Sequence, residues 1–280
     1  MGLTFTRMHG AGNDFVVLDD RTGYLKPHAK ALARALCDRR RGLGGDGLIL
    51  IGARPADGKA DFAMTYVNAN GDEGEMCGNG ARCVARRAME LGIAGMHSSF
   101  LTPAGIIRAD VSHAQVRVTL SPPGLPEPPT ILNVAGEPLE VHAIDTGVPH
   151  AVVFVADPDK VDVARLGPAL RNHPHFKRGC NANFVAVIPG KLRLRTFERG
   201  VEAETLACGT GAAAAALIAC HLGMMAPPVI IEARGGRLVV DFRKIDGRVT
   251  DVTLSGPTET VATGELDAHW LKARGLGDLA

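Results

Sequence analysis

Two cysteines stand in closely similar settings in this chain. Residues 76–83 read M-C-G-N-G-A-R-C and residues 207–214 read A-C-G-T-G-A-A-A. In both, the cysteine precedes G-x-G-A, where an extended segment is expected to pass into an alanine-rich helix. Backbone N–H groups and the helix dipole favour a thiolate at such a position and lower a cysteine pKa from about 8.5 toward neutrality. We therefore predict that Cys77 and Cys208 are a matched pair of acid-base groups.

A pair of acid-base thiols suits the inversion of a stereocentre. One group removes a proton from one face of a carbon, and the other delivers a proton to the opposite face. The proton beside an amino acid carboxylate is weakly acidic, so donors must hold that carboxylate as negative charge moves onto its oxygens. Backbone N–H groups at the two helix starts are placed to do this, at Gly78, Asn79, Gly209 and Thr210. This chemistry needs neither a metal nor another cofactor.

The elements that must position the cysteines occur twice in the same order. A proline-rich segment, residues 121–130, reads as a linker, because proline interrupts both helices and sheets. Before it we expect strands at 13–20, 47–51 and 62–67, a helix around 30–40 and the Cys77 helix at 81–89. After it we expect strands at 149–157, 184–188 and 192–197, a helix around 163–172 and the Cys208 helix at 212–220. Both copies close on a hairpin that ends V-T-L-S.

The register of the two copies is also preserved. Cys77 and Cys208 are 131 positions apart, and so are Asp110 and Asp241. We predict an α+β fold of two pseudo-symmetric domains, each a curled, mostly antiparallel sheet around a central helix, facing each other across a cleft. The predicted boundaries are 1–121 for the Cys77 domain, 122–130 for the linker, 131–262 for the Cys208 domain and 263–280 for a C-terminal tail.

Composition limits the classes of function. The chain has 280 residues, 46% of them hydrophobic and 22% charged, with a net charge of +1. Interspersed charges argue against a nucleic-acid surface or a polybasic membrane anchor and favour a small-molecule partner. No apolar run approaches the roughly 20 residues that span a bilayer, and residues 1–15 lack the pattern of a signal peptide, so we expect a cytoplasmic protein.

The six cysteines do not suggest disulfides or a metal. A chain of this length in a reducing compartment is not built on a disulfide framework, and neither C-x-x-C nor zinc-ligand spacing occurs. We expect Cys37, Cys83, Cys180 and Cys220 to be structural thiols in apolar surroundings.

Eight motifs together resemble the diaminopimelate epimerase family along nearly the whole chain. They are M-H-G-A-G-N-D-F at Met8, G-L-G-G-D-G at Gly42, V-N-A-N-G-D-E at Val67, M-C-G-N-G-A-R at Met76, G-V-P-H at Gly147, N-A-N-F at Asn181, F-E-R-G at Phe197 and A-C-G-T-G at Ala207. The resemblance implies a cofactor-independent interconversion of LL- and meso-diaminopimelate by a homodimer, feeding lysine and peptidoglycan synthesis.

The same resemblance assigns roles to individual residues. It makes Cys77 and Cys208 the catalytic bases, and His150 and Glu198 the groups that tune them. The implied substrate contacts are Asn13, Asn68, Gly78, Asn79, Asn181, Glu198, Arg199, Gly209 and Thr210. Arg199 can bind a distal carboxylate through two parallel hydrogen bonds, and the asparagines offer donors and acceptors to an ammonium and carboxylate pair.

Three positions depart from the family pattern. Val148 stands where many members have a substrate-binding asparagine, and Gly47 stands where some have a glutamine that reaches the ligand. Residues 198–205, E-R-G-V-E-A-E-T, are one residue longer than the E-R-G-x-G-E-T form. All three concern recognition of the far end of the substrate.

Parts of the sequence also fit three other functions. The nearest is another pyridoxal-independent racemase, acting on glutamate, histidine or proline. A thiol redox protein ranks lower, because it would not need the asparagines and Arg199. Residues 42–47 formally fit the G-x-G-x-x-G of dinucleotide-binding proteins, but a helix is expected before them and a strand after, the reverse of that motif's context.

Overall fold

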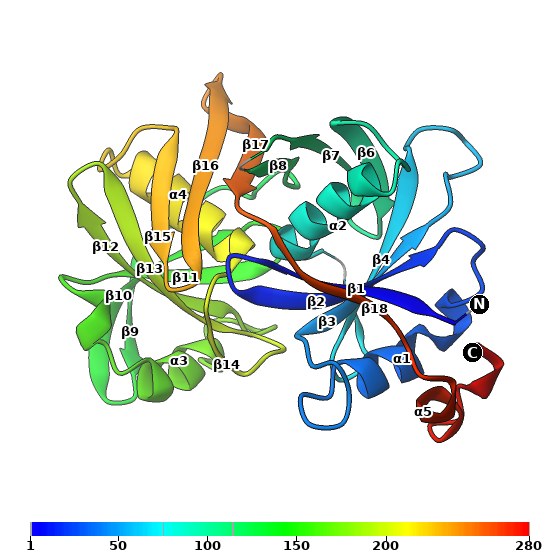
Figure 1. Ribbon diagram of the computed structural model, residues 1–280. Helices are drawn as coiled ribbons and strands as arrows, with labels where there is room; N and C mark the ends of the chain where they lie inside the picture. Colours follow the sequence, from blue (N-terminus) through cyan, green and yellow to red (C-terminus); the bar gives the residue numbers. More distant parts are fainter. Residues whose placement is uncertain (1, 75, 114, 280) are drawn as a thin grey trace. The chain divides into compact units, whose positions relative to one another are not determined.

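A computed structural model describes residues 2–74, 76–113 and 115–279. The chain forms two compact units. Unit 1 comprises Met1–Val118 and Pro257–Ala280, and unit 2 comprises Thr119–Gly256. Both units are mixed, sheet-rich assemblies with few helices (Figure 1), so the predicted α+β class is confirmed.

Unit 1 is built on a sheet in which most neighbouring strands are antiparallel. Its elements are β1 (Thr4–Gly10), β2 (Asn13–Asp20), α1 (Ala29–Leu36), β3 (Gly47–Gly52), β4 (Phe62–Asn68), β5 (Glu73–Gly74), α2 (Gly78–Glu90), β6 (His97–Thr102), β7 (Gly105–Val111), β8 (Val116–Thr119), β18 (Glu259–Glu265) and α5 (Ala268–Lys272), with short 3-10 turns at Lys26–His28 and Gly277–Leu279. The pairs β2–β3 and β4–β6 are parallel. A parallel pair needs a long crossover, and α1 and α2 lie in those two crossovers.

Unit 2 repeats this plan. Its elements are β9 (Thr130–Val134), β10 (Glu137–Asp145), β11 (Pro149–Phe154), α3 (Val163–Arg171), β12 (Asn181–Ile188), β13 (Lys191–Glu198), β14 (Ala203–Thr205), α4 (Gly209–His221), β15 (Val229–Ala233), β16 (Gly236–Ile245) and β17 (Arg248–Gly256), with a 3-10 turn at Pro158–Lys160. Here β11–β12 and β13–β15 are the parallel pairs, and α3 and α4 lie in the crossovers.

The second helix of each copy packs inside its own sheet. In unit 1, α2 packs against β1, β2, β3 and β7, and in unit 2, α4 packs against strands from β10 to β17 (Figure 1). The run of alanines at 212–216 is fully buried. Small side chains let the strands approach this helix from several sides, so the central helix predicted for each copy is confirmed.

The chain's last strand completes unit 1. β18 pairs antiparallel with β1, as β9 pairs with β10 in unit 2. Residues 257–262, which the sequence placed in the second domain, therefore belong to unit 1, together with the predicted tail. The predicted linker at 122–130 lies within unit 2, where the N–H groups of Gly124 and Glu127 donate to carbonyls of β10 at 2.7 and 2.9 Å.

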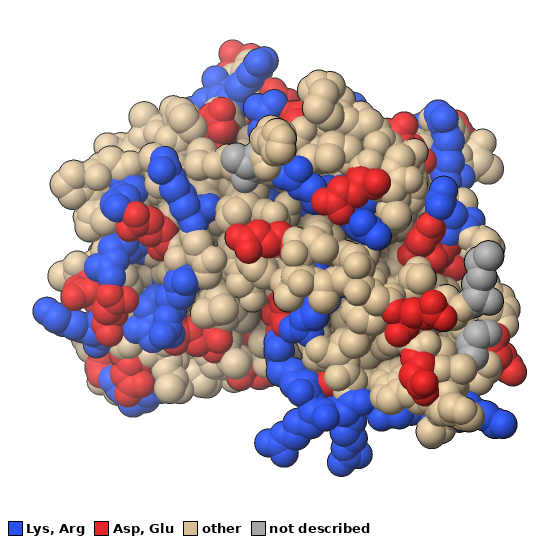
Figure 2. Space-filling model, viewed as in Figure 1, with Lys and Arg blue, Asp and Glu red and all other residues tan. Residues whose placement is uncertain are grey.

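Charged side chains of both signs are interspersed on the visible face (Figure 2). Ion pairs within one unit include Arg117 with Asp110 and Arg171 with Glu202. Among the described residues, no helix is long and apolar enough to span a membrane.

Candidate active site

Each of the two predicted cysteines is the N-cap of its helix. Cys77 precedes α2 with an extended backbone, and its Sγ accepts a hydrogen bond from the N–H of Gly80 at 3.4 Å. Cys208 precedes α4 in the same way and accepts from the N–H of Gly211, also at 3.4 Å. The strand-to-helix turn inferred from the doubled motif is therefore confirmed. A side chain in this position satisfies a backbone donor that the helix cannot.

A tight hairpin brings Asn13 to Cys77. β1 and β2 are joined by Ala11 and Gly12, and both have positive φ, at 53° and 82°, as a two-residue turn between twisted strands requires. Asn13 is the first residue after this turn. Gly10, on the other side of the turn, lies so close to α2 that a Cβ there would be 2.9 Å from the carbonyl oxygen of Asn79. The motif around Met8 thus serves close packing of the hairpin on α2.

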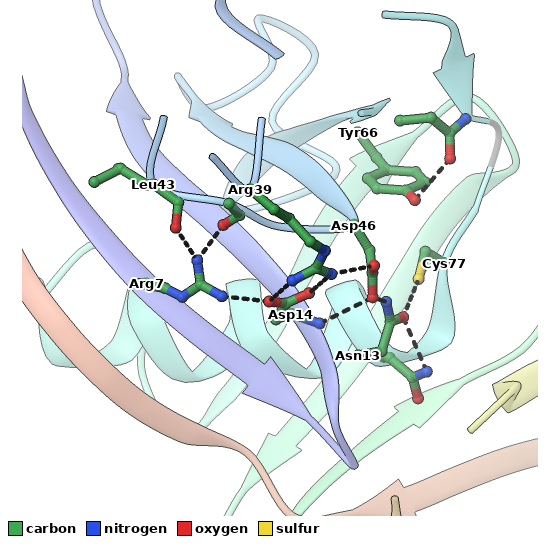
Figure 3. A network of polar contacts seen from close by, with 11 residues as sticks. Arg7, Asn13, Asp14, Arg39, Leu43, Asp46, Tyr66 and Cys77 are labelled. Carbon is green, nitrogen blue, oxygen red and sulfur yellow. Dashed lines mark hydrogen bonds and ion pairs between the residues drawn. The ribbon is translucent and has the colours of Figure 1, made fainter. Parts of the chain in front are cut away.

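Asn13 is the centre of a polar cluster around Cys77 (Figure 3). Its Oδ1 lies 3.6 Å from Cys77 Sγ and accepts from Asn79 Nδ2 at 3.1 Å. Its Nδ2 donates to Asp46 at 2.5 Å. Four of the predicted site residues, Asn13, Cys77, Gly78 and Asn79, therefore meet at the start of α2.

An ionic network lies behind this cluster. Arg39 donates to both Asp14 and Asp46 at 2.8 Å, and Arg7 forms an ion pair with Asp14 (Figure 3). Burial alone would raise the pKa of Asp14, but hydrogen bonding and the charge of Arg39, together with Arg7, hold that pKa below its usual value. The carboxylate of Asp14 is therefore ionised at neutral pH.

Tyr66 fills the space that Gly47 leaves. A Cβ on Gly47 would lie 2.5 Å from the Tyr66 ring, and a Cβ on Gly74 would meet the same ring at 2.5 Å. The hydroxyl of Tyr66 donates to Asn68 Oδ1 at 2.8 Å. Where some family members place a glutamine, this chain therefore has an aromatic ring from the neighbouring strand, and that ring orients the predicted substrate contact Asn68.

Cys208 has a different environment from the one expected for a helix-capping thiol. It is buried, and burial together with the negative charge of Glu198 raises its pKa well above the usual value, although hydrogen bonds from Thr210 and Gly211 oppose this. The expectation that the helix start lowers this pKa toward neutrality is therefore wrong for Cys208. Desolvation and a like charge outweigh the helix N-terminus here.

His150 is fully buried and neutral. Burial, with the nearby charge of Arg199, lowers its pKa to about 3. Its Nδ1 lies 3.1 Å from Nδ2 of Asn183, which also donates to the carbonyls of Ala151 and Asn181. Since carbonyls only accept, the Asn183 amide has one orientation, with its nitrogen toward Nδ1 of His150. Nε2 of the ring lies 3.5 Å from Nδ2 of Asn181, so an amide nitrogen faces each ring nitrogen.

Two other predicted residues of unit 2, Asn181 and Arg199, lie near this histidine. Asn181 Oδ1 accepts from the backbone N–H of Arg199 at 2.7 Å, and the Arg199 side chain donates to the carbonyl of Arg178 at 3.1 Å. Glu198 accepts from the Thr205 hydroxyl. In the longer stretch 198–205, Glu202 has a positive φ of 56° and pairs with Arg171, which holds the loop against α3.

Three of the four remaining thiols are buried, as expected. Cys37, Cys83 and Cys180 are buried, burial raises the pKa of each to about 12, and Cys220 at the end of α4 is half-buried. Within the ranges that the structure describes, no cluster of three or more His, Cys, Asp and Glu side chains forms a metal-binding geometry.

Several residues of the site were not predicted from the sequence. They are Asp46, Tyr66, Asn183 and Arg82, whose guanidinium donates to Asn79 Oδ1 at 2.8 Å. Asp46 and Asn183 lie inside motifs that were singled out, but their side chains act on neighbouring amides, and this depends on strand register. The sequence holds one indication of the role of Tyr66, namely glycines at the two positions that face its ring. Gly74 is directly opposite Tyr66 on β5, and Gly47 is on the neighbouring strand β3.

Comparison with known proteins decides the family. The model of the family described as diaminopimelate epimerase matches residues 5–125 and 142–260. The chain belongs to the diaminopimelate epimerase family. It is 42% identical to the diaminopimelate epimerase of Aquifex aeolicus over 96% of this chain and 100% of the relative. It is 40% identical to that of Methanothrix thermoacetophila over 94% and 95%.

Solved structures share the fold of this epimerase-family chain at low sequence identity. A probable proline racemase from Agrobacterium radiobacter superposes with a TM-score of 0.72 at 19% identity, covering 99% of both chains. A phenazine biosynthesis protein from Bacillus anthracis gives 0.74 at 15% identity, covering 95% and 99%. These likenesses show the two-domain fold alone, because identity is too low to transfer an activity.

Proposed function

We propose that this protein interconverts LL- and meso-diaminopimelate without a cofactor, with Cys77 and Cys208 as the two acid-base groups. The observation that carries the proposal is that each thiol caps a buried helix of one copy, in a chain about 40% identical to diaminopimelate epimerases over nearly its whole length. The reaction moves one proton from the α-carbon to one thiolate, while the other thiol supplies a proton to the opposite face.

The helix starts supply the donors that this reaction needs. N–H groups in the first turns of α2 and α4, at Gly78, Asn79, Gly209 and Thr210, have no acceptor inside their own helix. They can bind a carboxylate whose negative charge grows as the α-proton leaves. Each capping thiol is hydrogen-bonded to the first turn of its own helix. In each unit, one rigid element therefore carries both the thiol and the N–H groups proposed to bind the carboxylate.

The two thiols differ in the proton that each holds at rest. Glu198 and burial keep the proton on Cys208, since both disfavour a buried thiolate. Cys208 then begins a reaction cycle as the acid, and the complementary role of base falls to Cys77. After one turnover the roles are reversed, and a proton must be exchanged before the next turnover in the same direction.

The far end of the substrate carries a second carboxylate and ammonium. We propose that Asn68, Asn181 and Arg199 contact it, as the family resemblance implies. Asn68 and Asn181 are each held in one orientation. The carbonyl of Asp72 accepts from Asn68 Nδ2 at 3.2 Å, and the backbone N–H of Arg199 donates to Asn181 Oδ1. Preorganised amides of this kind lose little freedom on binding, which favours affinity for one particular ligand.

The direct test is conversion of LL-diaminopimelate by the purified, reduced protein in heavy water. We expect meso-diaminopimelate with deuterium at one α-carbon and no requirement for added cofactor. A panel with glutamate, histidine and proline tests the substrate, because Val148 replaces a polar contact of many relatives. Absence of both exchange and epimerisation with diaminopimelate, or faster turnover of a panel member, would refute the assignment.

Two further proposals concern the oligomeric state and the cellular location. The family resemblance supports a homodimer, which light scattering would report as twice the 29.4 kDa mass of one chain. The need for two reduced thiols supports a cytoplasmic location, which fractionation of the source cells would test.

A further inference from the structure

An asparagine amide can present either its oxygen or its nitrogen to a ligand, and its neighbours decide which. In unit 1, four side chains form a continuous hydrogen-bonded series. Arg82 Nη2 contacts Asn79 Oδ1 at 2.8 Å, Asn79 Nδ2 contacts Asn13 Oδ1 at 3.1 Å, and Asn13 Nδ2 contacts Asp46 Oδ2 at 2.5 Å. The series runs from the interior of α2 to the residue before β3.

Arg82 and Asp46, at the two ends of this series, fix the orientation of the amides of Asn79 and Asn13. A guanidinium only donates, so Asn79 must turn its oxygen to Arg82 and its nitrogen to Asn13. A carboxylate only accepts, and Asp46 also accepts from Arg39 at 2.8 Å and from the backbone N–H of Asp14 at 3.3 Å. Asn13 must therefore direct its nitrogen to Asp46 and its oxygen to Asn79.

The fixed orientation determines what Asn13 offers to a ligand. Its oxygen faces Asn79 and, at 3.6 Å, the thiol of Cys77, while one of its two amide hydrogens is used by Asp46. Among the described residues, Asp46 is the one partner recorded for Asn13 Nδ2. No described residue accepts the second hydrogen of this amide, so it can donate to a ligand. A carboxylate oxygen can accept this hydrogen, and an ammonium, which only donates, cannot.

The position of Arg82 supports a role confined to the Cys77 half of the site. Its side chain is fully buried, and its acceptors among the described residues are neutral, namely Asn79 Oδ1 and the carbonyl oxygen of Gly78. Burial lowers its pKa to about 10, so it is still charged at neutral pH. A buried cation without a counter-ion is costly. In the other copy the residue 131 positions later is Ala213, so the fold itself does not need this charge.

We propose that Asp46 and Arg82 are positioning residues that hold Asn13 with its amide N–H toward a carboxylate of the bound amino acid. This deepens the proposed function, on which it rests, by naming the substrate group that Asn13 recognises. Asp46 acts through one hydrogen bond to Asn13, and Arg82 acts through Asn79. Neither side chain needs to touch the substrate.

The test uses pimelate, which has the carbon chain and both carboxylates of diaminopimelate but neither ammonium. Asp46→Asn keeps the shape of the side chain, yet its amide can donate to Asn13 and let that amide turn over. We expect pimelate binding, measured by calorimetry, to weaken about tenfold or more, as for the loss of a hydrogen bond to a charged group. The KM for diaminopimelate should rise by a similar factor, with a smaller change in kcat.

A matched control separates positioning from general effects. Asp110→Asn makes the same change at a carboxylate of the same unit that pairs with Arg117 and His97, away from Cys77. It should leave pimelate binding within about twofold of wild type. Arg82→Lys, which keeps the charge but not the planar fork, should weaken pimelate binding as Asp46→Asn does.

Unchanged pimelate affinity in Asp46→Asn, or an equal loss in Asp110→Asn, overturns the inference, and so does a wild-type protein that does not bind pimelate. The proposed function has its own outcome in the same experiment. If wild type epimerises diaminopimelate while Asp46→Asn matches it in KM and pimelate binding, the function holds and the positioning role fails. If pimelate binds as expected but diaminopimelate is not epimerised, the function fails instead.

Discussion

Phe15 and His150 occupy the same position in the two copies. Phe15 is in register with Gly47 on the parallel pair β2–β3, and His150 is in register with Asn181 on β11–β12. Both side chains are fully buried. The repeated scaffold thus places a hydrocarbon ring in one unit where the other has an imidazole with a lowered pKa. The copies share their backbone plan and differ in the polar groups near each thiol.

This difference gives a prediction for Cys208. Since the charge of Glu198 helps to raise the thiol pKa, Glu198→Gln should lower it, and alkylation of Cys208 by iodoacetamide should begin at lower pH. Mass spectrometry of protein alkylated across pH 6–10 measures this. Glu202→Gln, at a carboxylate paired with Arg171, is the control and should leave the profile in place. An unchanged or upward-shifted Cys208 profile in Glu198→Gln would contradict the electrostatic argument.

His150 makes stability depend on pH. Its pKa of about 3 in the folded protein lies below the roughly 6.5 of an unfolded chain, so between these values the unfolded state binds a proton that the native state does not. Its contribution destabilises the native state as pH falls from about 6.5 toward 3, with a limiting slope of about 1.4 kcal/mol per pH unit. Above pH 6.5 it has no effect.

His150→Phe tests this dependence by introducing the residue that the other copy has at the same position. Urea unfolding at pH 7 and pH 5 should show a smaller loss of free energy in the variant than in wild type. An identical loss in both proteins would mean that another group is responsible.

Gly47 is predicted to be intolerant of any side chain. A Cβ would lie 2.5 Å from the Tyr66 ring and 2.8 Å from the carbonyl oxygen of Val67, so Gly47→Ala forces the ring or the strand to move. Overpacking of this kind costs about 1–3 kcal/mol, which thermal unfolding would report. Gly95→Ala, whose Cβ would have no neighbour closer than 3.8 Å, is the control. Equal melting temperatures for wild type and Gly47→Ala would show that Tyr66 does not occupy this space.

Local patterns predicted much of the fold. The helix starts at Cys77 and Cys208 followed from glycines after a cysteine, and the strands at 47–52 and 191–198 were placed to within one residue because their apolar or alternating pattern matches their burial. The repeat order followed from comparing these patterns. Each of these features depends on residues that are close in sequence.

Features that depend on distant residues were not predictable in the same way. The return of β18 to β1 joins the two ends of the chain, and nothing in residues 259–265 indicates which strand they pair with. The raised pKa of Cys208 depends on burial and on Glu198, both set by tertiary packing. Asp46 and Arg82 hold Asn13 only because β2, β3 and α2 come together, so their contribution emerges from the fold.

The two-thiol mechanism is tested most directly by removing each thiol in turn. Cys77→Ala and Cys208→Ala should both lose epimerisation of LL-diaminopimelate, because each turnover needs a base on one face of the α-carbon and an acid on the other. Cys220→Ala, at the far end of α4, should keep wild-type turnover and serves as the control. Complete loss in both variants, with activity retained in the control, is the result we predict. Sustained epimerisation by either Cys77→Ala or Cys208→Ala would contradict the mechanism.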